Sequence, residues 1–140
     1  MISIRLSVEI DRPVGDVFDY VADPEHLPEW QESAIEVHQI SDGRWKEERR
    51  IAGRLVESET EVIAREPGKR LRLRSDAGSV ALDVDHVFSP IDQGTRIEVT
   101  VEGKVGGLMR FAEGTIQARA QTELEADLER LKAILESAGR

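Results

Sequence analysis

The chain has 140 residues, enough for one domain with a hydrophobic core, and a formal net charge of −9 at pH 7. Apart from local basic clusters, this charge argues against nucleic-acid binding and against electrostatic docking on anionic lipid. The absence of cysteine excludes disulfides, thiolate metal ligands and a cysteine nucleophile. No apolar run approaches the roughly 18 residues of a membrane span, and the N-terminus lacks a signal peptide's apolar block. We therefore expect a single cytoplasmic domain over residues 1–140.

The first elements are predicted from the alternation of apolar and polar residues over positions 2–10, which is typical of a half-buried strand. Pro13 then begins a short helix, and the Asp23-Pro24 pair ends it. A second short helix or turn is expected over residues 24–30. These elements predict a strand followed by two short helices.

A series of further strands follows, separated by turns rich in glycine, proline and aspartate. We place these strands at about residues 33–40, 44–52, 54–65, 69–76, 80–89 and 95–105. Their order predicts an antiparallel meander with helices at both ends.

Charged residues indicate which face of the sheet is exposed. Glutamates alternate along residues 57–61, arginines along 70–74, and aspartates stand at 83 and 85. Such cross-strand pairs of opposite charge contribute roughly 0.2–1 kcal/mol each, so we interpret the arginine row as a solvated face rather than a phosphate site. The residues of opposite parity point inward: Val56, Ser58, Thr60, Val62, Leu71, Leu73, Ser75, Leu82, Val84, His86, Phe88, Ile97, Val99 and Val101.

Residues 106–140 are predicted to form one long amphipathic helix. Its second half carries leucines at positions 124, 128, 131 and 135, the spacing of a core stripe. Its first half continues this face with Ile116 and Ala120, mixed with Gln117 and Gln121. Because one helix covers a sheet incompletely, we expect this first half to form one wall of a cavity. Close packing of a strand against the small residues is the alternative.

Residues 11–30, with the sequence DRPVGDVFDYVADPEHLPEW, resemble the opening of a known family. The resemblance is to the polyketide cyclase/dehydrase and lipid-transport proteins of the START and birch-pollen-allergen-like (SRPBCC) helix-grip superfamily. It continues in the turn at 92–95 and the terminal helix around 128–132, so it covers essentially the whole chain. The residues that carry it include Pro13, Val17, Phe18, Asp23, Pro24, Pro28 and Trp30.

This resemblance implies an α+β helix-grip fold. A curved antiparallel sheet of about seven strands would wrap around the long C-terminal helix, with two short helices after the first strand and a cavity between sheet and helix. Trp30 stands where the family has a tryptophan at the mouth of the cavity. It would either line the ligand entrance or plug the end of the core.

His86 is the first candidate for chemistry, because strand parity places it inward between Val84 and Phe88. An inward histidine can act as an acid or base near neutral pH. The alternative is a structural histidine that is satisfied by a neighbouring hydroxyl or carbonyl.

Glu47 and Arg49 are the second candidates. They share the parity of Trp45 and Ile51, which would turn them toward the cavity as a pair able to anchor a carboxylate, enolate or hydroxyl group. A bulge or an exposed strand end would instead return both to solvent.

No cofactor or metal is expected. His26 and His38 have no histidine or carboxylate at metal-ligand spacing, and the chain has no phosphate loop, dinucleotide fingerprint or Ser-His-Asp order.

The main functional hypothesis is a carrier or sensor that binds a small hydrophobic molecule, such as a lipid, a polyketide or another aromatic or isoprenoid compound. The alternatives are an aromatase/cyclase or dehydratase-like enzyme that uses His86, Glu47 and Arg49, and an interaction module whose cavity is filled. We expect no nucleic-acid partner and no stable membrane insertion, while exposed sheet edges make a homodimer plausible. The expected ligand-binding residues are Trp30, Trp45, Ser58, Thr60, Leu73, Val84, Phe88, Met109, Ile116, Gln117 and Gln121.

Overall fold

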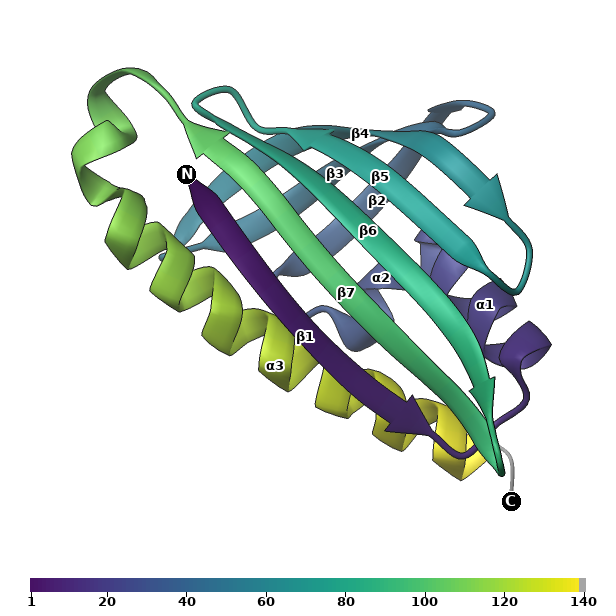
Figure 1. The fold of residues 1–140 in the computed structure, drawn as a ribbon. Coiled ribbons are helices and arrows are strands. Elements are labelled where there is room, and N and C mark those ends of the chain that lie inside the picture. The colour runs from purple at the N-terminus through teal and green to yellow at the C-terminus, as the bar shows by residue number, and fades with distance from the viewer. Residues whose placement is uncertain (139–140) are drawn as a thin grey trace.

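A seven-stranded antiparallel sheet curves around one long helix in the computed structural model, which describes residues 1–138 (Figure 1). The strands lie in the order β1-β7-β6-β5-β4-β3-β2, so β1 and β2 are the two edges. This architecture confirms the predicted helix-grip fold class. The strand bounds are β1 Ile2–Ile10, β2 Ala34–Ser41, β3 Arg44–Ile51, β4 Arg54–Glu66, β5 Arg70–Asp76, β6 Val80–Ile91 and β7 Gly94–Val105.

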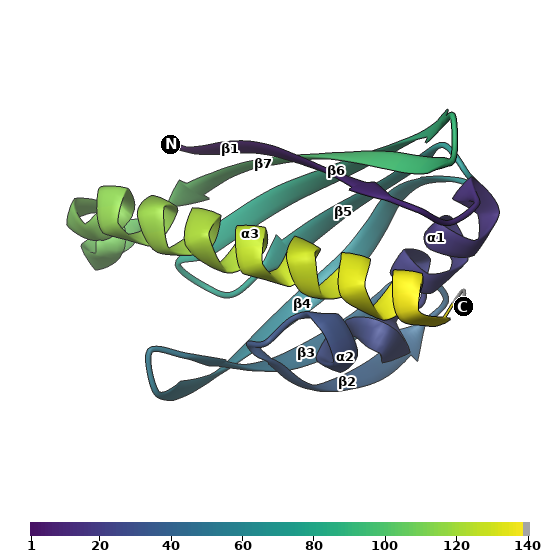
Figure 2. The same ribbon diagram turned by 90° about the horizontal axis from the view of Figure 1, so that it is seen from below.

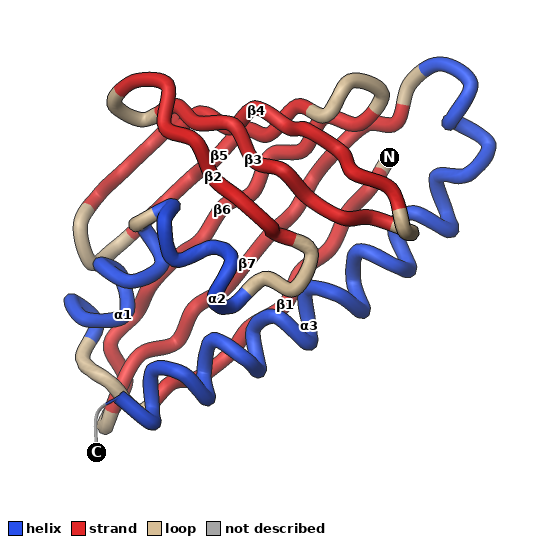
Figure 3. Tube along the Cα trace, turned by 180° about the vertical axis from the view of Figure 1, so that it is seen from behind, coloured by secondary structure: helices blue, strands red, loops and turns tan. Residues whose placement is uncertain are grey.

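Helices lie at one end of the sheet and across its concave face (Figure 2). The short helix α2 contacts both β2 and the long helix α3, and it joins the edge of the sheet to that helix (Figure 3). The helix bounds are α1 Val14–Ala22, the 3₁₀ helix η1 Pro24–His26, α2 Leu27–Trp30, the 3₁₀ helix η2 Gly107–Ala112 and α3 Glu113–Ala138.

The predicted helix over residues 106–140 begins later than expected. Its first turns form η2, and the α-helix starts only at Glu113. The break has a local cause, because Gly107 adopts a φ of 61°, which ends the extended β7 backbone before helical geometry begins. Residues 139 and 140 of the predicted helix lie outside the described residues.

Ion pairs on the convex face follow the predicted charge rows in part. Arg70 forms a bidentate pair with Asp85, and Arg72 forms one with Asp83 at 2.9–3.0 Å. The glutamates of β4 instead meet basic residues of β3, as in the pair between Arg44 and Glu59. The reason is the register, because the β5 partner of Glu59 is another acid, Asp76.

Burial is uneven along α3. Its second half packs Leu128, Leu131 and Leu135 into the core, at the end of the sheet that α1 covers. In its first half, Ile116 and Ala120 contact the core but stay partly exposed. The helix therefore seals the α1 end of the concave face and leaves the other end, near η2, partly open.

Side chains of α3 also protect the free edge of β1. Gln117 accepts a hydrogen bond from the Ser3 amide at 3.1 Å, and Lys132 donates one to the Glu9 carbonyl at 2.6 Å. These bonds satisfy backbone groups that an edge strand would otherwise expose. Within residues 1–138, no helix is both long and apolar enough to span a membrane.

Candidate functional site

A polar cluster lies on the concave face of β3 and β4, and Glu47 is at its centre. Trp45, Glu47 and Arg49 alternate along β3 on the inward side, and the Glu47 side chain is buried, with 4% of its surface exposed. Of the two orientations that the sequence left open, the structure has the inward one for Glu47. No bulge occurs between β3 and β4, so the parity set by Trp45 holds along the whole strand.

Both carboxylate oxygens of Glu47 accept hydrogen bonds. Oε1 accepts from Trp45 Nε1 at 2.7 Å and from Thr60 Oγ1 at 3.1 Å. Oε2 accepts from Arg49, at 2.7 Å from Nε and 2.6 Å from Nη2. A buried carboxylate is tolerated only with such compensation. The cluster continues through the Thr60 hydroxyl to Ser75 on β5, at 3.1 Å.

Arg49 links this cluster to the segment before β2. Its guanidinium donates to Ser33 Oγ at 2.8 Å and to Gln31 Oε1 at 2.5 Å. Arg49 therefore holds the concave face of the sheet to the chain that leaves α2. Ser33 and Gln31 carried no sequence signal for this role, because only the tertiary fold brings them to β3.

Asp127 on α3 completes the connection from the helix side. Its Oδ1 accepts from the Glu32 amide at 3.2 Å and from Arg130 at 3.1 Å, while Arg130 also donates to the Trp30 carbonyl. Burial raises the pKa of Asp127, and the Glu32 amide, Arg130 and Arg49 oppose that rise. The sequence contained one indication that Asp127 is buried, because it interrupts the apolar face of the helix between Leu124 and Leu131.

Two buried polar atoms have no hydrogen-bond partner within residues 1–138. One is the hydroxyl of Ser58, a residue 5% exposed that lies directly across from Glu47 in the β3–β4 register. The other is Nε1 of Trp30, whose ring is packed into the core at the end of α2. Unpaired buried groups are uncommon and costly, and each one marks a place where a ligand or water can supply the missing bond. The burial of Trp30 agrees with its plugging role.

His86 faces inward as predicted, and its surroundings are those of a structural residue. Its Nδ1 lies 2.9 Å from the carbonyl oxygen of Leu71, which can only accept, so Nδ1 donates. Burial lowers the pKa of His86, against smaller opposing effects of the Leu71 hydrogen bond and of Asp85. The ring also stacks on Phe88, which packs edge-on against Phe18 of α1. His86 and Phe88 therefore belong to the sealed end.

The apolar candidates for ligand binding lie in two places, the partly open half of the concave face and the 3₁₀ helix η2. Leu73 and Val84 are Cα partners on β5 and β6, face inward and remain partly exposed, as does Ile116 on the first half of α3. Their position agrees with the expected wall of a cavity. Met109 lies in η2 and is largely exposed, outside the concave face.

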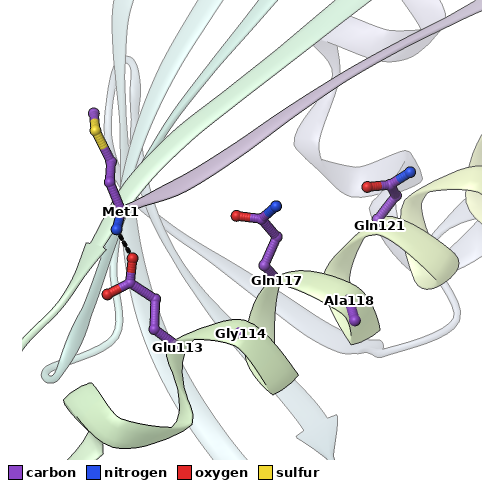
Figure 4. Close-up of a pocket in the computed structure, with 6 residues that line it drawn as sticks. All are labelled: Met1, Glu113, Gly114, Gln117, Ala118 and Gln121. Carbon is purple, nitrogen blue, oxygen red and sulfur yellow. Dashed lines mark ion pairs between the residues drawn. The ribbon is translucent and has the colours of Figure 1, made fainter.

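Gln117 and Gln121 lie on the β1 side of α3. They line a cavity of about 380 Å³ together with Met1, Glu113, Gly114 and Ala118, and the ammonium of Met1 points at the Glu113 carboxylate (Figure 4). A second cavity of about 250 Å³ follows the same groove, between residues 6–8 of β1 and the helix near Leu128. The amide of Gln117, one of the expected ligand-binding residues, is turned to the edge of β1, where it accepts from the Ser3 amide.

On the convex face, His38 lies near two carboxylates, although the sequence analysis expected none at metal-ligand spacing. The ligand atoms of Glu36, His38 and Glu48 all lie within 4.8 Å of one another, on the edge strand β2 and its neighbour β3. Sequence spacing missed this group because Glu36 and His38 are two residues apart on a strand and Glu48 arrives from the paired strand. Exposed acidic groups of this kind are common without a bound ion.

Comparison with known proteins places this geometry in a family. The model of the family described as polyketide cyclase / dehydrase and lipid transport matches residues 1–136. Comparison with curated protein sequences finds no match.

Solved structures share the fold at low sequence identity. A START superfamily protein from Mycobacterium smegmatis has a TM-score of 0.83 at 14% identity, with 99% of each chain covered. A protein from Deinococcus radiodurans has a TM-score of 0.76 at 23% identity, again with 99% of each chain covered. The di-domain ARO/CYC StfQ from the steffimycin biosynthetic pathway has a TM-score of 0.78 at 13% identity, over 99% of this chain and 52% of that one. The family match over nearly the whole chain shows that this protein belongs to the polyketide cyclase/dehydrase and lipid-transport family.

Proposed function

We propose that the protein binds a small, largely apolar molecule on the open part of its concave face, as a carrier or sensor. The molecule would lie between β4–β6 and the first half of α3, against Leu73, Val84 and Ile116. Its polar group would meet the cluster around Glu47. The observation that carries this proposal is the Ser58 hydroxyl, which is buried beside Glu47 and has no partner within residues 1–138.

The surrounding chemistry supports an apolar ligand with one oxygen-bearing end. Inward side chains of the open half are aliphatic, whereas the hydroxyls of Ser58, Thr60 and Ser75 gather on one side of them. Ligand sites commonly combine an apolar lining with a few convergent polar groups. The family supports either a binding or a cyclase role and leaves the ligand open.

A pair of tryptophan substitutions on α3 tests the location. Ala120→Trp would add a large ring where Ala120 packs against the core on the concave side, whereas Ala118→Trp would fill the groove beside β1. We expect wild type to bind members of a panel of lipids, quinones and aromatic polyketides, detected by native mass spectrometry and thermal shift. Ala120→Trp should lose that binding and Ala118→Trp should keep it. Loss only in Ala118→Trp would move the site to the groove, and no binding by wild type would contradict the proposal.

The cyclase-like enzyme is the second candidate, and the buried carboxylate of Glu47 is the observation that favours it. A carboxylate beside hydroxyls in a shaped site can guide protons while the site brings reactive carbons together. His86 is a weaker candidate, because its Nδ1 is engaged by Leu71 in the sealed end. In an assay of polyketide closure, Glu47→Gln should abolish turnover and leave binding intact. Unchanged turnover would remove Glu47 from the mechanism.

A further inference from the structure

Exposed apolar side chains gather at the open end of the molecule. Phe111 in η2 is 89% exposed and Met109 is 42% exposed, while Leu55, next to the β3–β4 turn, is 68% exposed. The β3–β4 turn and η2 lie at the same end of the fold, opposite the end that carries α1 (Figure 2). The Gly106 amide, 2.8 Å from the Ser79 carbonyl, anchors the start of the η2 segment to the β5–β6 turn. An aromatic side chain this exposed has no role in stabilising the fold.

The same end is basic, although the whole chain is acidic. The segments 50–55 and 104–113 contain Arg50, Arg54, Lys104 and Arg110. Of the nearby acids, Glu113 pairs with the N-terminal ammonium, while Asp76 accepts from the neutral Gly78 amide and keeps its charge. The basic residues of the two segments still outnumber these acids. The charge asymmetry is therefore local and would be missed in the net charge of −9.

The helical segment at the opposite end is acidic. Residues 11–30 form α1, η1 and α2, and they carry one basic residue, Arg12, among acids at positions 11, 16, 19, 23, 25 and 29. An anionic surface would thus attract the open end and repel these helices. This polarity fixes an orientation in which the partly open concave face is turned toward that surface.

We propose that the open end docks peripherally on a bilayer that contains anionic lipid. Arg54 and Arg110 face the headgroups, and Phe111 and Met109 enter the interface from η2. Basic residues with adjacent exposed aromatic and aliphatic groups are the combination by which peripheral proteins hold an anionic membrane. Docking in this orientation would let an apolar ligand pass between the bilayer and the concave face without crossing water. That last step rests on the proposed ligand-binding function, whereas docking itself does not.

Flotation with vesicles tests the docking directly. We expect the protein to bind vesicles of phosphatidylcholine mixed with phosphatidylglycerol, to bind pure phosphatidylcholine far more weakly, and to be released by salt. The double variant Arg54→Glu/Arg110→Glu should weaken binding at least roughly tenfold, since each basic residue near an anionic surface contributes measurably. Phe111→Ser should weaken it by roughly tenfold, because an apolar ring no longer leaves water.

Matched controls lie away from the open end. Ile40→Ser removes an exposed apolar residue near the β2–β3 turn, and Lys69→Glu reverses an exposed charge in the β4–β5 turn. Both should bind vesicles like wild type. The proposal would be overturned if the protein did not bind the anionic vesicles, or if the control variants lost as much vesicle binding as the test variants. It would also be overturned if the protein bound an acidic protein but no vesicle.

The docking and ligand-binding proposals can fail separately. Ala120→Trp should still bind vesicles, because it changes the concave face and none of the docking residues at the open end. Vesicle binding without any ligand would leave docking standing and contradict the carrier role. Ligand binding without vesicle binding would do the reverse.

Discussion

Ser58 and Thr60 lie two residues apart on the same face of β4 and differ in one respect. The Thr60 hydroxyl donates to Glu47 and is within hydrogen-bond distance of Ser75, whereas the Ser58 hydroxyl has no partner within residues 1–138. A buried hydroxyl without a partner costs about 1–3 kcal/mol, and a made hydrogen bond contributes about 1 kcal/mol. The two hydroxyls should therefore have opposite effects on stability.

This contrast gives a prediction for the ligand-free protein. Ser58→Ala should raise the free energy of unfolding by about 1 kcal/mol, and Thr60→Val should lower it by a similar amount, both measured by urea denaturation. Ser58→Ala should at the same time weaken binding of the proposed ligand, because the ligand would lose a hydrogen-bond partner. A loss of stability in Ser58→Ala would mean that the hydroxyl already has a partner, such as a bound water.

His86 predicts a pH dependence of stability. Because burial lowers its pKa in the folded protein, the unfolded chain takes up a proton near pH 6.5 while the folded chain does not. The stabilisation is present above pH 6.5 and is lost as the pH falls toward the folded-state pKa, by up to about 1.4 kcal/mol per pH unit. His86→Asn, whose amide can replace the Nδ1 donor, should flatten this part of the curve in urea denaturation between pH 7.5 and 5. A slope retained in His86→Asn would contradict the assignment.

At the scale of elements, close backbone approach explains why two strand positions require glycine. Gly94 begins β7, and a Cβ there would overlap the Ile10 carbonyl at the end of β1. Gly103 has a similar restriction against β6, from the side chain of Leu82 and the carbonyl of Ala81. β7 can therefore pair with β1 and β6 only because these two positions are glycines, which have no side chain.

A matched pair of alanine substitutions tests this. Gly94→Ala should lower the free energy of unfolding by more than about 2 kcal/mol, because the obstructing atom belongs to the backbone and cannot move aside. Gly15→Ala lies in α1 with nothing within 4 Å of the new Cβ, and it should raise stability by up to about 1 kcal/mol. Thermal or urea unfolding measures both, and similar effects of the two changes would contradict the argument.

At the scale of the whole molecule, the burial gradient along α3 divides the protein into a sealed and an open half. The free energy of local unfolding is lowest where few apolar side chains are buried. Amides of residues 115–121 should therefore exchange hydrogen faster than those of residues 124–135, after correction for intrinsic rates, in hydrogen exchange followed by mass spectrometry. A bound ligand on the concave face should slow the first group and leave the second unchanged. Uniform protection along α3 would show that the helix packs equally well throughout.

The sequence by itself determined which face of most strands and of the long helix is buried. Alternation along the strands predicted which side chains of β4, β5 and β6 face inward, including His86, because a strand has only two faces. It left the orientation of Glu47 on β3 open. The leucine spacing predicted the buried half of α3 for the equivalent reason in helices. The resemblance over residues 11–30 supplied the family, which the match over residues 1–136 confirmed.

Only the tertiary structure decided how these faces meet. It turned Gln117 to the β1 edge, joined Arg49 to Gln31 and Ser33, and placed Asp127 beside the Glu32 amide. It also left the Ser58 hydroxyl without a hydrogen-bond partner among residues 1–138. These contacts join residues that are distant in sequence or on different elements, and they depend on the curvature of the sheet and the rotation of α3. Periodicity fixes the face on which a residue lies, whereas the packing of one element on another determines which groups find partners and which stay available to a ligand.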